Sequence, residues 1–253
     1  GFTFAQDAPL WMRHSVISPD GTTIAFTYKG DIYTVPVAGG RAMQITTNPA
    51  YDTAPVWSPD SKRIAFASDR MGSLDVYIVA KDGGEPRRLT THSGSETPLA
   101  FTDAGHVLFS AGIMPSAEAV VFPSNGQFNQ VYRVSVEGGR PTMISSMPME
   151  CISINKEGAM LYQDKKGYED YWRKHHVSPI ARDIWMYTPG KEPQYRQLTT
   201  FGGEDREPVW APDGKTFYYL SEENGSFNIY RRTPGDAKAV QLTHYTKNPV
   251  RYL

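Results

Sequence analysis

The sequence contains a single cysteine, Cys151, so it can build neither a disulfide framework nor a thiolate metal cluster. Its apolar residues do not gather in runs long enough to cross a membrane. It also lacks an excess of charge, because 26 lysines and arginines face 27 aspartates and glutamates. These absences exclude a membrane-spanning helix and leave no global field to attract nucleic acid or an anionic lipid surface.

The residues that are present favour β structure. The 253 residues include 22 glycines, 19 prolines and 15 tyrosines, and 40% of them are apolar. Turn formers combined with aromatic residues are typical of short strands joined by tight turns. No useful length of chain shows the 3.6-residue period of a helix. We therefore expect an all-β protein with a sizeable core.

A repeat of about 40 residues organises the chain. The turn Ser18–Gly21 recurs as Ser58–Ser61, and variants of it follow three more times. Each repeat contains four short β-type runs, a composition that predicts the four-stranded blade of a β-propeller. We expect an N-terminal segment at 1–13 and a propeller at 14–253. Its five complete blades are predicted at residues 14–47, 53–91, 96–145, 149–200 and 206–244.

The end of the chain matches the beginning of a further repeat. Residues 248–253 resemble the first run of the second and fifth repeats, which predicts the first strand of a sixth blade in a truncated six-bladed propeller. An unpaired strand edge there would invite pairing with another chain, so oligomerisation through the open edge is expected.

Aspartates recur at two positions of the repeat. The first set precedes glycine or a small residue in the turn, where the carboxylate is expected to hydrogen-bond the turn itself. The second set starts the third run, and we expect these carboxylates to hydrogen-bond nearby backbone. A Ca²⁺ ion held by such carboxylates stays an open alternative, although no spacing forms a known calcium loop. The first set is Asp20, Asp60, Asp103 and Asp213, and the second is Asp31, Asp75 and Asp183.

Two insertions interrupt the repeat between its second and third runs, at Ala111 to Asn129 and at Asp164 to Arg182. Long loops on a rigid scaffold are common functional sites. The second insertion combines aromatic rings with cations, which suits docking of a peptide carboxylate, an acidic partner or a neighbouring domain. The competing interpretation is a loop whose cations pair with Glu169 and Asp170. The candidate docking residues are Tyr168, Tyr171, Trp172, Arg173, Lys174, His175 and His176.

Nothing in the sequence predicts a catalytic, cofactor or metal site. The serines lack the strand-turn-helix context of a nucleophile elbow. His175 and His176 are adjacent, whereas two zinc ligands on a helix stand four residues apart. We therefore expect no enzymatic activity from this chain alone, no cofactor and no bound metal.

The repeat, with its Ser-Pro-Asp turn and closing Leu-Thr, resembles the TolB-type, WD40-like propeller repeat. The segments Lys166–Tyr168, Trp172–Lys174 and Arg182–Trp185 resemble the corresponding blade of tricorn-type serine proteases. That resemblance implies the leading, six-bladed propeller of such a protease, with catalytic domains elsewhere in the polypeptide. It further implies a role in peptide or product passage. The paired arginines that anchor peptide C-termini in archaeal members have no counterpart at His92–Glu96.

Two functions remain open. The first is a non-catalytic module that gates peptide passage and docks the remaining domains of the same polypeptide. The second is a stand-alone TolB-like interaction propeller of the bacterial cell envelope. Residues Phe2–Ala5 resemble the end of a secretory signal, which predicts a periplasmic location.

Overall fold

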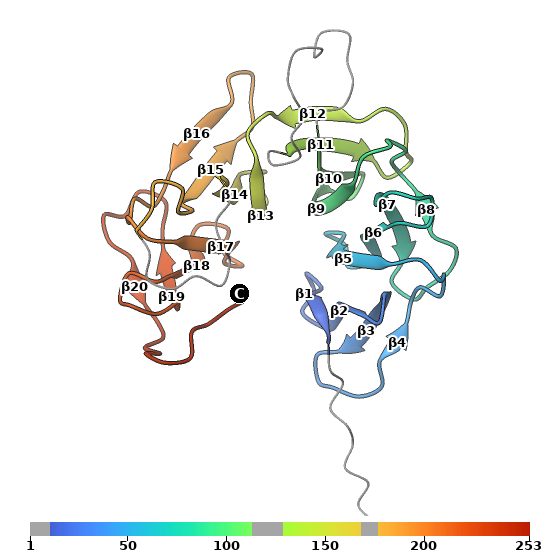
Figure 1. Cartoon of the computed structure of the whole chain (residues 1–253), viewed down its shortest axis with the longest axis horizontal. Coiled ribbons are helices and arrows are strands. Elements are labelled where there is room, and N and C mark those ends of the chain that lie inside the picture. Colours follow the sequence, from blue (N-terminus) through green and yellow to red (C-terminus); the bar gives the residue numbers. More distant parts are fainter. Residues whose placement is uncertain (1–10, 113–128, 168–176) are drawn as a thin grey trace, which may run out of the picture. The chain divides into compact units, whose positions relative to one another are not determined.

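The computed structural model describes residues 11–112, 129–167 and 177–253, and over these it shows β-strands and no helix (Figure 1). No segment of the described chain is therefore a candidate membrane-spanning helix. The strands form five sheets of four strands, called blades 1 to 5 in chain order. Each strand pairs with its neighbours in sequence, and the predicted all-β fold with five four-stranded blades is confirmed.

The chain divides into two compact units. The first comprises residues 1–111 and 133–142, and the second comprises residues 112–132 and 143–253. Blade 1 consists of β1 (Arg13–Ile17), β2 (Thr23–Tyr28), β3 (Asp31–Pro36) and β4 (Met43–Gln44). Blade 2 consists of β5 (Asp52–Trp57), β6 (Arg63–Ser68), β7 (Asp75–Ala80) and β8 (Arg87–Arg88). Blade 3 consists of β9 (Glu96–Asp103), β10 (His106–Ala111), β11 (Gln130–Ser135) and β12 (Thr142–Ser145).

The remaining two blades belong to the second unit. Blade 4 consists of β13 (Met149–Ile154), β14 (Met160–Asp164), β15 (Ile184–Thr188) and β16 (Gln194–Gln197). Blade 5 consists of β17 (Asp205–Trp210), β18 (Phe217–Ser221), β19 (Asn228–Arg232) and β20 (Val240–Gln241). The two predicted insertions separate β10 from β11 and β14 from β15.

The turn between the first and second strands of a blade is held by its aspartate. Ser18 Oγ donates to Asp20 Oδ1 at 2.6 Å, and the same oxygen accepts the Thr22 N–H at 3.0 Å. The hydrogen bond from Ser18 is the largest influence that lowers the pKa of Asp20. In blade 2 the pair Ser58 and Asp60 repeats the 2.6 Å contact. The prediction that these aspartates serve the turn is confirmed.

A threonine hydroxyl closes the blade after its fourth strand. In four of the blades it accepts the backbone N–H of a residue at the beginning of the third strand, which would otherwise lack a partner. The four hydrogen bonds are Ile32 to Thr46 at 3.0 Å, and Val76 to Thr90, Ile184 to Thr199 and Ile229 to Thr243 at 2.9 Å.

A backbone hydrogen bond also recurs where a first strand begins beside the preceding blade. In the first unit the Asp52 N–H donates to the Gly30 carbonyl, and the Glu96 N–H donates to the Leu74 carbonyl, both at 2.7 Å. In the second unit the Asp205 N–H donates to the Arg182 carbonyl at 2.9 Å.

The predicted first strand of a sixth blade does not form, because residues 248–253 have no strand structure. Antiparallel strand structure needs a hydrogen-bonded partner, and no second strand lies beside this segment among the described residues. The Val250 N–H nevertheless donates to the Phe227 carbonyl at 3.0 Å, the bond that begins a blade elsewhere.

The core lies between successive blades. In the first unit Phe66, Ile64 and Tyr77 of blade 2 pack against Ala25 and Ile32 of blade 1. In the second unit blades 4 and 5 meet in the same way. Trp57 and Trp210 occupy equivalent places in their blades: Trp57 is buried in the first interface, and Trp210 is partly buried and packs against the second. Their indole N–H groups donate to the carbonyls of Val16 and Ala159, both at 3.1 Å.

Candidate functional site: the base of the fourth-blade insertion

The insertion between β14 and β15 is described at its two ends, at residues 165–167 and 177–183. The predicted docking residues Tyr168, Tyr171, Trp172, Arg173, Lys174, His175 and His176 lie outside the described residues. The site that can be built from the structure is therefore the base from which these residues are carried.

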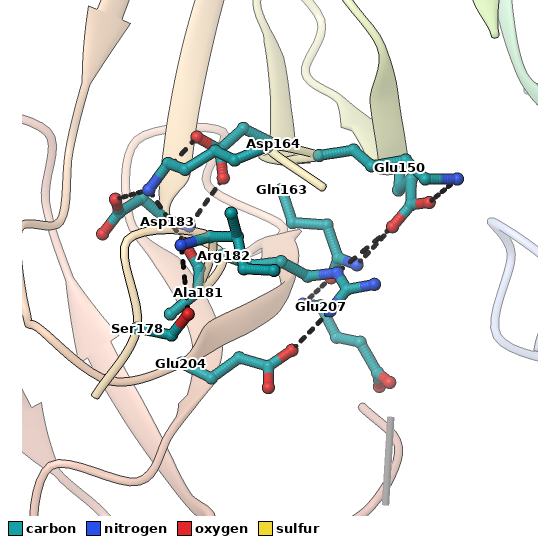
Figure 2. Close-up of polar contacts among 12 residues, drawn as sticks. Glu150, Gln163, Asp164, Ser178, Ala181, Arg182, Asp183, Glu204 and Glu207 are labelled. Carbon is teal, nitrogen blue, oxygen red and sulfur yellow. Dashed lines mark hydrogen bonds and ion pairs between the residues drawn. The ribbon is translucent and has the colours of Figure 1, made fainter. Parts of the chain in front are cut away.

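Lys166 joins the two ends of the insertion. Its ammonium donates to the Ala181 carbonyl at 2.8 Å, forms an ion pair with Asp183, and lies 3.5 Å from Asp164 Oδ2. Asp164 and Asp183 also bond each other, since the Asp183 N–H donates to Asp164 Oδ1 at 2.8 Å (Figure 2). The insertion therefore leaves and rejoins the blade at one point.

Burial raises the pKa of Asp164, although the Asp183 N–H and the Lys166 charge oppose that shift. A buried carboxylate is costly unless charges and donors surround it. Lys166 and the Asp183 N–H supply these partners, and Trp185 Nε1 adds a hydrogen bond to Asp164 Oδ2 at 3.1 Å. The charges at the base thus compensate one another.

Arg182 is the second cation of the base, with 10% of its side chain exposed. It lies between two carboxylates, 3.3 Å from Glu150 Oε2 through Nε and 2.8 Å from Glu204 Oε1 through Nη1 (Figure 2). Burial acts to lower the pKa of Arg182, but the charges of Glu150 and Glu204 outweigh it and raise the pKa. Arg182 thereby links the first strand of blade 4 to the segment that leads into blade 5.

The Glu150 carboxylate contacts three side chains of the base, those of Arg182, Gln163 and Lys165. Gln163 Nε2 donates to its Oε2 at 3.1 Å, and Lys165 Nζ lies 3.3 Å from its Oε1. Burial acts to raise the pKa of Glu150, but the hydrogen bond from Gln163 and the charges of Arg182 and Lys165 leave it lowered. Glu150 is thus ionised at neutral pH and stabilises both cations.

The network continues from Gln163 into blade 5. The Glu207 N–H donates to Gln163 Oε1 at 2.9 Å, and Glu207 Oε2 accepts the Leu253 N–H at 2.9 Å. On the other side of Arg182, the Glu204 N–H donates to Glu222 at 3.2 Å. The base of the insertion is therefore braced against both blades of the second unit.

Apolar packing and backbone bonds fix the returning arm. The Ser178 N–H donates to the Gly202 carbonyl at 3.3 Å, and the Ala181 N–H donates to the Ser178 carbonyl at 3.0 Å. A Cβ added at Gly167 would lie 3.1 Å from the Ile180 side chain, so the two arms approach closely there. Val177, with 74% of its surface exposed, marks where the returning arm meets solvent.

The base supplies anchoring rather than reactive groups. Lys166 and Arg182 are both engaged by carboxylates, so neither is left to bind an anion. Among the described residues no group of three His, Cys, Asp or Glu side chains is placed to hold a metal ion. What the arrangement can do is fix the two described ends of the insertion, 165–167 and 177–183, to each other and to the blades.

One prediction for the repeated aspartates is wrong. The carboxylates at the start of the third strand accept hydrogen bonds from side chains rather than from nearby backbone. Asp31 accepts from Gln44 Nε2 at 3.0 Å and from Thr46 Oγ1 at 3.2 Å. Asp75 pairs with Arg88 at 2.9 Å, and Asp183 accepts from Gln197 Nε2 at 3.1 Å. The fourth strand reaches each of them, because it lies beside the third.

Sequence reasoning found the insertion but missed its base. Glu150, Glu204 and Arg182 are far apart in the sequence and carry no spacing that predicts a contact. The one sequence feature that pointed to the base was Asp183, which stands where Asp31 and Asp75 stand in the earlier repeats.

Four-stranded blades joined by these repeated turns define a β-propeller, and comparison with known proteins narrows the class further. The family described as the tricorn protease N-terminal β-propeller domain matches residues 9–253. The chain belongs to this family.

The relatives are longer than the chain. Tricorn protease homolog 1 of Streptomyces coelicolor is 25% identical over 224 residues, which are 88% of this chain and 20% of that protein. The crystal structure of the tricorn protease superposes with a TM-score of 0.74 and 19% identity, covering 97% of this chain and 23% of that one. A putative TolB from Agrobacterium tumefaciens superposes with a TM-score of 0.70 and 15% identity, covering 92% and 81%.

Proposed function

We propose that this chain is a non-catalytic propeller module that gates peptide or product passage and docks other domains in a tricorn-like protease. Family membership supports the proposal, as does the relative that is named a tricorn protease homologue and of which the chain spans 20%. The partners would be peptides and the remaining domains of the same polypeptide.

The observation that carries the docking role is the braced base of the fourth-blade insertion. Lys166 and Arg182 fix both ends of a segment whose sequence is rich in aromatic rings and cations. A support of this kind reduces the conformational entropy that docking must overcome. Aromatic and arginine side chains on such a support are the residues that most often dominate binding.

Replacing Trp172 and Arg173 with alanine in the full-length polypeptide should weaken domain docking or peptide turnover and leave the propeller folded. The strands of the five blades and the braced arms of the insertion are built from other residues. Turnover of fluorogenic peptides, domain association and the melting temperature are the measurements. Val177→Ala, on the exposed returning arm, is the matched control. Unchanged turnover and association at an unchanged melting temperature would contradict the docking role.

The 253-residue chain alone should not hydrolyse peptides, since its sequence lacks a nucleophile context and the polar network at the base of the fourth-blade insertion serves as an anchor. Fluorogenic peptides incubated with purified protein provide the measurement. Hydrolysis that one Ser or His substitution abolishes would show that the chain is itself a peptidase.

A second candidate is a stand-alone TolB-like interaction propeller of the cell envelope. It is favoured by the Agrobacterium tumefaciens structure, because the chain covers 81% of that protein rather than a small part of it. A periplasmic location suits both candidates and rests on the signal-like Phe2–Ala5. Reading the gene beyond Leu253 separates the two, because only the first requires a second propeller and a catalytic lobe.

We also propose that residues 248–253 are the first strand of a further blade once a second strand is present to pair with it. The hydrogen bond from Val250 to Phe227 supports this, because it repeats the bond that begins blades 2, 3 and 5. An unpaired edge at this segment would associate with another chain.

A further inference from the structure

Two carboxyl groups meet at each described junction between successive blades within a unit. One lies at the start of the third strand of a blade or just before it, and the other starts the first strand of the next blade. The backbone bond at the junction brings them together, since the Glu96 N–H donates to the carbonyl of Leu74, the residue before Asp75. The pairs are Asp31 with Asp52, Asp75 with Glu96, and Asp183 with Asp205.

The three pairs differ in their cations. Arg70 Nη2 lies 3.1 and 3.0 Å from the two oxygens of Asp52. In the third pair, Lys166 forms an ion pair with Asp183. At the middle junction Arg88 Nη2 lies 2.9 Å from Asp75 Oδ2, and Glu96 forms no ion pair within the part of the chain that the structure describes.

The middle pair is also completely buried. Asp75 and Glu96 each have 0% of their surface exposed, and all four of their carboxyl oxygens are inaccessible. Two ionised carboxylates with one cation would be costly in such a place. Ionised carboxylates only accept hydrogen bonds, so a bond between them requires a proton on one of the two.

Glu96 is the member that holds the proton. Among the described residues neither carboxyl oxygen of Glu96 has a hydrogen-bond donor as a partner, so a proton on Glu96 removes the cost of a second buried charge. Burial raises the pKa of Glu96 from 4.5 to about 7, and the Asp75 charge adds to the shift. Burial raises the pKa of Asp75 as well, but Arg88 acts to lower it, so Asp75 is the member of the pair whose charge a cation stabilises.

We propose that Asp75 and Glu96 share one proton and that its release loosens the junction between blade 2 and β9, so that the pair forms a pH-sensitive latch. The charged groups that face the pair from the described elements are Arg88 of β8 and His92 of the segment between β8 and β9. His92 Nδ1 accepts the Gly94 N–H at 3.0 Å, so the neutral ring carries its proton on Nε2.

The direction of the pH dependence follows from which state holds the proton. The closed junction keeps the proton of Glu96 up to about pH 7, whereas an opened junction releases it near 4.5. Opening therefore becomes easier as the pH rises from 4.5 towards 7 and changes little above that range. The latch is closed in mild acid and loosened in mild alkali.

Hydrogen exchange of the Glu96 amide reports on the latch directly, because its N–H donates to Leu74 across the junction. After correction for the intrinsic pH dependence of exchange, the opening constant at Glu96 should rise roughly ten- to a hundredfold between about pH 5 and about pH 8. The Asp52 amide, which makes the equivalent bond beside Arg70, is the matched control and should show no such rise.

Glu96→Gln keeps a donor for Asp75 and removes the titration, so it should abolish the rise and the infrared C=O stretch of a protonated carboxylic acid at this site. His92→Gln should retain both. Should Glu96→Gln fail to fold, Asp75→Asn serves instead: it removes the Asp75 charge that adds to the shift of the Glu96 pKa, so the rise should become smaller. A rise that persists in the folded Glu96→Gln variant, that is undiminished in Asp75→Asn, or that His92→Gln abolishes would overturn the shared proton.

Discussion

Replacing Arg182 with methionine should lower the free energy of unfolding by about 3–5 kcal/mol, the effect of removing one partner from a buried ion pair. The guanidinium lies between Glu150 and Glu204, and the side chains of Arg182 and Glu204 are 10% and 8% exposed. Methionine fills the volume but leaves Glu204 without its cation and Glu150 with Lys165 alone. Denaturant unfolding of the second unit, followed by the fluorescence of Trp185 and Trp210, measures the loss.

Arg87→Ala is the matched control. Arg87 also forms an ion pair with a glutamate, at 2.7 Å from Glu137, but the side chains are 49% and 73% exposed. Solvent screens such a pair, so its removal should have little effect. Adding Glu204→Gln to the Arg182 variant should recover part of the loss, since one buried charge disappears. Equal effects of the two single arginine substitutions would show that the base of the insertion is not a buried network.

Phe66→Ala should destabilise the first unit by about 3–5 kcal/mol, as expected for a phenylalanine truncated in a packed core. Phe66 has 0% exposed surface, stacks on Tyr77 with ring centroids 5.9 Å apart, and lies beneath Arg70 at 5.6 Å. The truncation leaves a cavity between blades 1 and 2 and weakens the position of Arg70 over the rings. Thermal and denaturant unfolding measure the change.

Met71→Ala provides the comparison for this second substitution, because Met71 is 64% exposed at the turn after β6. Its loss should be small, while Phe66→Leu should fall between the two. If Phe66→Ala and Met71→Ala had similar effects, the interface between blades 1 and 2 would not be the core of the first unit.

The blades were predictable because their signals are local. The turn at Asp20 and the closing threonines act over a few residues or within one repeat, so the sequence displays them at a fixed period. The side-chain partners of Asp31 and Asp75 were harder to predict from the sequence, because they depend on which strands lie side by side. The base of the insertion was not predictable, because Glu150 and Glu204 meet Arg182 only through the packing of two blades. The segment 248–253 shows a further limit, since its strand-like sequence does not form a strand in the absence of a pairing partner.

The backbone bond at the blade junction bears on how this fold tolerates divergence. Asp52, Glu96, Asp205 and Val250 all make it, so an acid and an aliphatic residue serve equally well. Main-chain atoms make this hydrogen bond, so the side chain at this position is not needed to hold the blades together and can vary. The tricorn protease structure, only 19% identical, keeps a similar fold, with a TM-score of 0.74, on such terms. Individual blade junctions can then gain different polar or titratable side chains while the propeller scaffold stays the same.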